Sequence, residues 1–241
     1  MSRQNPYRDL LAPVVRHAVA IVSGGMDSTV LAYLLHRSGA TLTMLSFDYG
    51  QRHRAELAYA SRTALTLGAT HHVVDLTGLV GLLAGSALTD TSVEVPDGHY
   101  TDTSMRATVV PNRNAIMLDI AVAQAVAVGA DAVAFGAHAG DHPIYPDCRP
   151  EFLRAFQATA QLGNEGFAHP DLHVAAPFID MTKADIAGIG AQLGVPFADT
   201  WSCYKGAAVH CGTCGTCVER REAFAVAAVP DPTEYASAGV S

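Results

Sequence analysis

The sequence has 241 residues, 49% of them apolar, with a formal net charge of −8 and an isoelectric point near 5.7. A chain of this length can bury the core of one domain, with or without a small appendage. The acidic balance excludes a general nucleic-acid binder, and no apolar run approaches the roughly 18 residues that a membrane span needs. The polar start has no signal-peptide core, so we expect a cytoplasmic protein without direct nucleic-acid or membrane partners.

Predicted strands and helices alternate along the chain. We expect strands at 17–22, 41–47, 71–76 and 131–136, and helices at 27–37, 53–67, 114–128, 150–162, 183–193 and 218–226. The segment 85–105 is rich in Thr, Ser, Asp and Gly without a period, which is typical of a long loop. The alternation predicts an α/β fold, a doubly wound parallel sheet that binds ligands at the carboxyl ends of its strands.

The first predicted strand leads directly into the sequence Ser-Gly-Gly-Met-Asp-Ser at 23–28. Two glycines at a strand-to-helix turn let the backbone approach a ligand closely, because no Cβ intervenes. The helix that follows directs free N–H groups and its positive dipole end at the same place, which favours phosphate. The candidate nucleotide-binding residues are Val22, Ser23, Gly24, Gly25, Met26, Asp27, Ser28, Thr29, Val30, Leu31 and Ala32.

This loop differs from the kinase-type loop, in which a lysine follows the last glycine. The chain has two lysines, Lys183 and Lys205, and neither follows a glycine loop. The S-G-G-x-D-S pattern instead resembles the signature of PP-loop ATP pyrophosphatases, which hold the pyrophosphate of ATP while the α-phosphorus is attacked. Two roles are open for Asp27, either to help hold Mg²⁺ between the pyrophosphate oxygens or to cap the helix.

Four of the five cysteines, Cys203, Cys211, Cys214 and Cys217, have the spacing C-x7-C-x2-C-x2-C. Without an export signal, disulfides are disfavoured, and consecutive C-x-x-C units bring thiolates together around a tetrahedral ion. A structural zinc with four sulfur ligands is therefore the preferred interpretation. An iron–sulfur cluster, or a site in which His210 replaces Cys203, stays open. For the isolated Cys148 we expect buried packing.

Several motifs in one order carry a family resemblance. They are S-G-G-x-D-S, F-D-Y-G-Q-R-H at 47–53, V-P-N-R-N at 110–114, Y-P-D-C-R at 145–149, T-K at 182–183 and the cysteine cluster. Together, from about residue 18 to 224, they resemble the QueC family of 7-cyano-7-deazaguanine synthases. The resemblance implies an ATP-dependent ligase that converts 7-carboxy-7-deazaguanine and ammonia into the nitrile through adenylated intermediates. It also implies one structural zinc on the four cysteines.

The motif positions suggest further site residues. Lys183 and Arg113 are candidates for stabilising charge on the phosphates as they separate. Carboxylates suit the N–H edge of a guanine-like ring, and arginine suits a substrate carboxylate. The candidate substrate-binding residues, which follow predicted strands, are Asp48, Asp141, Tyr145, Asp147 and Arg149. We assign no catalytic base to the histidines.

Two other functions are weighed against this one. Another PP-loop adenylating enzyme, tRNA-modifying or amide-forming, would ordinarily add a basic domain or a nucleophilic cysteine, and neither is recognisable here. A zinc-ribbon interaction module with an inactive nucleotide fold conflicts with the intact loop. The expected organisation is an extension at 1–16, a PP-loop domain at 17–197, a zinc segment with a final helix at 198–229 and a tail at 230–241. A homodimer is the default expectation.

Overall fold

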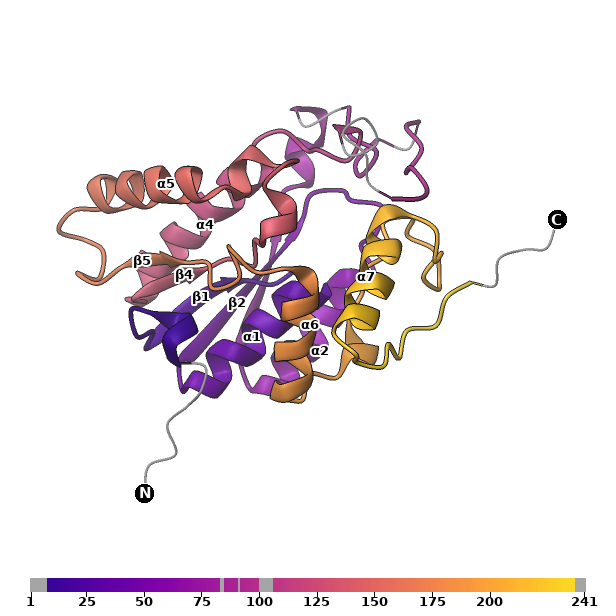
Figure 1. Cartoon of the computed structure of the whole chain (residues 1–241). Coiled ribbons are helices and arrows are strands. Elements are labelled where there is room, and N and C mark those ends of the chain that lie inside the picture. Colours follow the sequence, from indigo (N-terminus) through magenta and orange to yellow (C-terminus); the bar gives the residue numbers. More distant parts are fainter. Residues whose placement is uncertain (1–7, 83–84, 91, 100–105, 237–241) are drawn as a thin grey trace, which may run out of the picture.

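The computed structural model describes residues 8–82, 85–90, 92–99 and 106–236 (Figure 1). The strands in these ranges are β1 (His17–Ile21), β2 (Thr41–Asp48), β3 (Thr70–Asp75), β4 (Ala132–Ala134) and β5 (His173–Ala175). The helices are α1 (Met26–Ser38), α2 (Glu56–Leu67), α4 (Arg113–Val128), α5 (Pro150–Gly163), α6 (Lys183–Leu193) and α7 (Gly215–Val226).

The five strands form one parallel sheet in the order β3-β2-β1-β4-β5. The chain starts at the central strand β1, fills one side with β2 and β3, and then crosses to β4 and β5. Figure 1 shows α1, α2 and α6 on one face of the sheet and α4 and α5 on the other. The predicted doubly wound α/β fold is confirmed, and its switch point lies between β1 and β4, where such sheets bind ligands.

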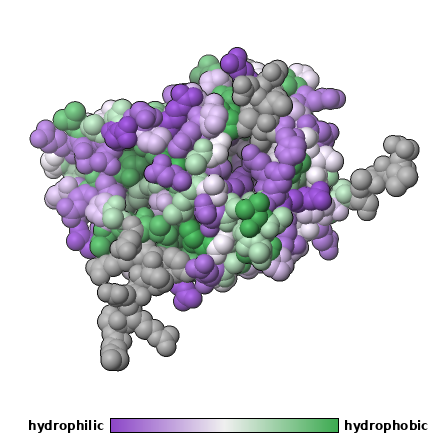
Figure 2. Space-filling model, in the orientation of Figure 1, coloured by the Kyte–Doolittle hydropathy of each residue, from purple (hydrophilic) through white to green (hydrophobic). Residues whose placement is uncertain are grey.

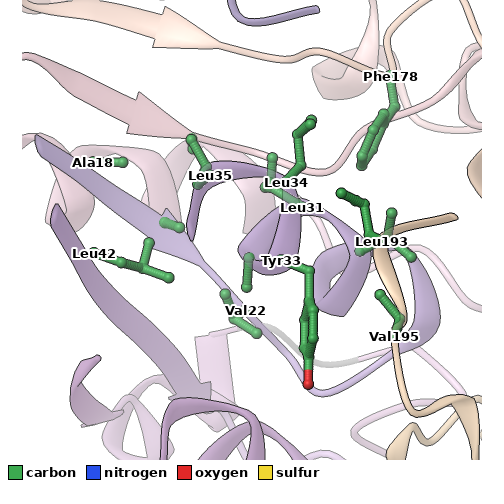
Figure 3. Close-up of a cluster of buried hydrophobic side chains, with 14 of the residues drawn as sticks. Ala18, Val22, Leu31, Tyr33, Leu34, Leu35, Leu42, Phe178, Leu193 and Val195 are labelled. Carbon is green, nitrogen blue, oxygen red and sulfur yellow. The ribbon is translucent and has the colours of Figure 1, made fainter. Parts of the chain in front are cut away.

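Each face of the sheet has its own apolar core, because alternate residues of a strand point to opposite faces. Ala18 and Ala20 of β1 pack with α1 and α6, whereas Val19 and Ile21 pack with α4 and α5. Figure 3 shows the first cluster, with side chains of α1 between the sheet and Phe178. Helices on both faces explain why β1 and β2 are buried along almost their whole length, including the polar Thr43 and Ser46 of β2.

The structure adds details that the sequence patterns did not show. The three-residue strand β5 was not predicted, because it is too short for a periodic pattern. Helix α2 begins at Glu56 and not at residue 53, since His53 belongs to the turn that the Glu56 N–H closes on its carbonyl at 3.0 Å. The described parts of the predicted loop at 85–105 contain no helix or strand.

The described start of the chain packs onto the domain. Leu11 and Val15 are buried in the same apolar core as side chains of α1, so the described part of the expected N-terminal extension contributes to packing.

Hydrophilic residues are distributed across the face shown in Figure 2, between smaller hydrophobic areas. Among the described residues, no helix has the length and apolar character to cross a membrane.

Candidate active site

The loop between β1 and α1 is closed by its own hydroxyl groups. Val22 continues the strand by donating its N–H to the Leu45 carbonyl at 2.8 Å. The Ser23 hydroxyl oxygen accepts the Gly25 N–H at 3.2 Å and lies 3.2 Å from the Ser28 hydroxyl oxygen. The loop is therefore preorganised at the start of a thirteen-residue helix, where N–H groups favour an anion.

The two glycines of the loop have different reasons for lacking a side chain. Gly24 has a φ of 95°, and a Cβ there would lie 2.2 Å from the Glu56 carbonyl oxygen. Its carbonyl also accepts the Trp201 N–H at 2.9 Å. Gly24 is therefore required for packing between α2 and the C-terminal segment, whereas Gly25 lines the cavity described next.

A cavity of about 230 Å³ opens at the carboxyl ends of β1, β2 and β4. The loop residues in its wall are Val22, Ser23, Gly25, Met26, Asp27 and Ser28. The other predicted nucleotide-binding residues, which are buried and lie outside this lining, are Gly24, Thr29, Val30, Leu31 and Ala32. The roles of all eleven in nucleotide binding stay predictions.

Lys183, the first residue of α6, points its ammonium group toward this loop. Its Nζ lies 3.6 Å from Asp27 Oδ2 and 3.0 Å from Glu219 Oε2 of α7. A capping box between Thr182 and Asp185 fixes the start of the helix and so positions the lysine. Burial lowers the pKa of Lys183, but Asp27 and Glu219 together raise it above its ordinary value, so the side chain is cationic. The structure thus joins the two motifs that carry Asp27 and Lys183.

Arg113, the other predicted catalytic residue, opens α4 on another wall of the cavity. Its Nη1 donates to the Tyr49 hydroxyl at 3.2 Å, and its guanidinium carbon lies 5.7 Å from the centre of that ring. Tyr145 lines the same cavity and its hydroxyl lies 3.2 Å from the Thr108 hydroxyl. Arg113 and Lys183 are far apart in the sequence, but both lie in the wall of this one cavity.

The predicted acidic substrate contacts are placed differently from one another. Asp141 lines the cavity, and its Oδ2 accepts the His138 N–H at 3.0 Å. Asp48 forms an ion pair with Arg54 and lies outside the lining. Asp147 also lies outside, because its oxygens accept the backbone N–H and the side-chain amide of Asn114, each at 3.1 Å, at the start of α4.

Arg149 is likewise absent from the cavity wall, and its Nε donates to the His142 carbonyl at 2.8 Å. Its neighbour Cys148 is buried, as expected, but it does line the cavity. Substrate roles for the five predicted residues stay predictions. Asp141 and Tyr145 are the two that the structure places in the wall.

Two buried titratable residues in the wall, His53 and Glu56, were not predicted. Burial raises the pKa of Glu56 to about 8, although Arg113 partly opposes the shift, and burial lowers the pKa of His53 to about 3. Their Nε2 and Oε1 atoms lie 3.4 Å apart. His53 belongs to the motif at 47–53, but its burial depends on residues distant in sequence and was not readable from that motif.

The four clustered cysteines come together as the spacing predicted. Their sulfur atoms all lie within 4.8 Å of one another, and none of the four forms a disulfide. For zinc with Zn–S bonds of about 2.3 Å, tetrahedral geometry requires sulfurs about 3.8 Å apart. Backbone N–H groups of Cys211 and Cys214 point at cluster sulfurs, at 3.4 and 3.2 Å. The cluster can hold a metal ion.

His210 is not among the residues that form this cluster in the described part of the chain. Its Nε2 accepts the Ser202 N–H at 3.0 Å and its ring packs 4.3 Å from that of Trp201, centre to centre. The structure thus places Cys203 in the cluster and His210 beside it. Trp201 and Thr216, beside the cysteines, line the cavity and so join the four-cysteine segment to it.

These features define an α/β nucleotide-binding fold of the PP-loop class with a four-cysteine segment. A family profile described as queuosine biosynthesis protein QueC matches residues 17–228. The chain therefore belongs to the QueC family, and the resemblance drawn from the motifs is confirmed.

Curated relatives agree over almost the whole length. A 7-cyano-7-deazaguanine synthase of Paracoccus denitrificans (strain Pd 1222) is 55% identical over 220 residues, covering 91% of this chain and 93% of the relative. That of Rhizobium meliloti (strain 1021) is 57% identical over 217 residues, covering 90% and 91%. An NH3-dependent NAD synthetase from Campylobacter jejuni aligns in structure with 17% identity and a TM-score of 0.46, over 76% of this chain and 66% of that chain.

Proposed function

We propose that this protein converts 7-carboxy-7-deazaguanine and ammonia into 7-cyano-7-deazaguanine, using ATP, in queuosine-type 7-deazapurine biosynthesis. The observation that carries the proposal is the cavity that unites the Ser-Gly-Gly loop with Lys183, in a chain at least 54% identical to curated synthases of that name. The alternative of another PP-loop adenylating enzyme is not favoured, because the family match spans 17–228.

The chemistry needs a carboxylate oxygen to become a leaving group. Attack of the acid on the α-phosphorus of ATP gives an acyl adenylate and pyrophosphate, and ammonia then displaces AMP to form the amide. A second ATP activates the amide oxygen in the same way, and loss of a proton and AMP leaves the nitrile. Such a site needs donors to phosphate and to developing negative charge more than it needs a strong base.

The residues in the cavity wall suit these demands. The loop N–H groups at the start of α1 and the cationic Lys183 would hold the pyrophosphate as it separates. Arg113, on another part of the wall, would stabilise the charge of the α-phosphate or of the substrate carboxylate. Asp141 and Tyr145 would contact the substrate from the side of β4.

Two metal ions belong to the proposal. Asp27 Oδ1 is buried and has no hydrogen-bond partner among the described residues, which fits a carboxylate that would help to hold Mg²⁺ on the phosphates. The four cysteines would hold one zinc ion. The bound ion would cross-link an irregular segment and so stabilise its folded conformation. All four protein ligands are sulfurs, so the zinc would be structural.

The test is product analysis of a purified enzyme supplied with ATP, ammonium and 7-carboxy-7-deazaguanine. The expected products are the nitrile, AMP and pyrophosphate, with the amide as an intermediate. ADP formation without AMP would overturn the mechanism. We also expect a homodimer in the cytoplasm, which light scattering and cell fractionation would check.

A further inference from the structure

One carboxyl group in the cavity wall has an oxygen to offer a ligand. Glu56, in the first turn of α2, is 8% exposed and lines the cavity. Gln51 Nε2 and His53 Nε2 each lie 3.4 Å from its Oε1. Both contacts that the described part of the chain gives to this carboxyl end on Oε1, which leaves Oε2 for a ligand.

The two neighbours that orient Glu56 are themselves held in place. The Gln51 amide donates to the Phe47 carbonyl and accepts the Tyr49 N–H, each at 2.9 Å. The His53 ring is 3% exposed and packs against Tyr204 at 4.8 Å between centres. Because burial keeps His53 neutral, the tautomer with hydrogen on Nε2 can donate to Glu56. The carboxyl group is thus preorganised.

The other two carboxyl groups of the described lining lie elsewhere in the site. Asp27 lies beside Lys183 at the nucleotide loop, and Asp141 accepts the His138 N–H. Glu56 is the remaining acidic residue in the lining of this cavity, among the described residues. The lining of the cavity also includes the apolar side chains of Phe47 and Met117, which suit a planar ring.

We propose that Glu56 binds the guanine-type edge of the substrate ring and determines specificity for it. This assignment rests on the proposed function. A guanine-type edge presents a ring N–H and an exocyclic amino group side by side, and the Oε2 atom of Glu56 has two lone pairs with which to accept them. Gln51 and His53 supply only donors toward Glu56, so the ring would complete the acceptor capacity of the carboxylate.

Binding should also be linked to proton release. The groups that face Glu56 are Arg113 of α4, His53 of the preceding turn and the Tyr49 hydroxyl. Free Glu56 is mostly protonated at neutral pH, and the two ring donors favour the carboxylate. Calorimetry of acid binding in buffers of different ionisation enthalpy should detect proton release at pH 7, and Glu56→Gln should abolish this contribution.

The decisive experiment measures discrimination between the acid and its analogue that lacks the 2-amino group. The ratio of their kcat/KM values for AMP formation should be about 100 or more in the parent, because the analogue leaves a buried acceptor unpaired. Glu56→Gln, which cannot accept both donors, should lower this ratio to about 10 or less, while the Kd for ATP stays within about twofold. Glu222→Gln, on the exposed side of α7, is the matched control and should keep the parent ratio.

The outcomes separate the two levels of the argument. If the parent forms no AMP with the acid, the proposed function fails, and the assignment of Glu56 fails with it. If the parent forms AMP and Glu56→Gln keeps the parent ratio, only the Glu56 assignment is overturned. If Glu56→Gln does not fold, Glu56→Asp serves as the second variant, because it keeps a carboxylate on a shorter side chain. This variant should bind the acid more weakly but still discriminate against the analogue. The assignment would be overturned if Glu56→Asp changed neither the affinity for the acid nor the kcat/KM ratio.

Discussion

Lys183 Nζ lies 3.0 Å from Glu219 Oε2, which joins the start of α6 to the helix that carries Cys217. The same ammonium group lies 3.6 Å from Asp27 Oδ2 of the Ser-Gly-Gly loop. Three segments that are distant in sequence thus meet at one cation beside the cavity. The four-cysteine segment therefore contributes directly to the surroundings of the predicted catalytic lysine.

Removing this cation should stop turnover without unfolding the protein. Lys183→Met should lower kcat/KM for AMP formation by about 100- to 1000-fold, as expected for loss of one group that stabilises developing charge. Lys205→Met is the control, because the other lysine pairs with Asp97 at 2.6 Å, outside the cavity lining, and should keep its activity. Near-parental activity in Lys183→Met would refute the assigned role.

The two loop glycines should respond differently to alanine. Gly24→Ala places a Cβ 2.2 Å from the Glu56 carbonyl oxygen in a left-handed backbone conformation, so we expect low soluble yield and a lower Tm. Gly25→Ala meets its nearest neighbour, the Ser23 hydroxyl, at 3.2 Å and should fold. Its Kd for ATP should rise about tenfold or more, since the Cβ enters the anion site. Thermal melts and ATP titration measure both; a stable Gly24→Ala protein would contradict the packing argument.

The cysteine cluster should contain zinc and stabilise the fold. Elemental analysis should find one zinc and no iron per chain, and the protein should be colourless. Cys214→Ser should lose the metal and lower the Tm, with activity falling in step with the folded fraction. A well-folded Cys214→Ser protein that binds ATP but forms no amide would instead indicate a catalytic metal.

Stability should depend on pH through Glu56. The pKa of its carboxyl is about 8 in the folded protein, above the value of about 4.5 in the unfolded chain, so folding favours the protonated form. This contribution is complete below the unfolded pKa and is lost as the pH rises through the folded pKa. As the pH rises from 5 to about 8, the parent should therefore lose stability relative to Glu56→Gln. Urea titrations would measure this as a change in the difference between their free energies of unfolding. A difference that does not change with pH would contradict the shift.

Arg220 should be a major source of stability in the C-terminal segment. It is 1% exposed and donates to the Phe197 carbonyl at 3.0 Å, the Thr200 hydroxyl at 2.8 Å and Asp231 at 3.2 Å. Arg220→Ala leaves Asp231 without its cation and should cost about 3 to 5 kcal/mol. The exposed neighbour Arg221 offers the control, and Arg221→Ala should cost about 0.5 kcal/mol or less in the same denaturation experiment.

Much of the fold was predictable because its signals are local. The first strand with the Ser23–Gly24 loop after it lies within one short stretch, and so do the four closely spaced cysteines. The residue types and their spacing therefore define the local structure in both places. Apolar runs indicated the buried strands for the same reason. The strand β5 escaped prediction because it has three residues, too few for a period.

The site was predictable only in part, because partner choice is a long-range property. Asp48, Asp141 and Asp147 look alike as acidic residues after strands, yet Asp147 caps α4 by hydrogen bonds to Asn114, 33 positions earlier. Gly24 was interpreted as a phosphate contact, and its tight packing against Glu56 became visible only in the structure.

The class of fold, the position of the Ser-Gly-Gly loop, the cysteine cluster and the family were readable from the sequence, since each depends on residues close together in the chain or on motif order. Which titratable groups face the cavity depends on the packing of distant elements. Burial and the competition among hydrogen-bond partners depend on elements that meet from across the chain, as at Glu56, His53 and Arg113. Desolvation then shifts their pKa values, and no local pattern records it.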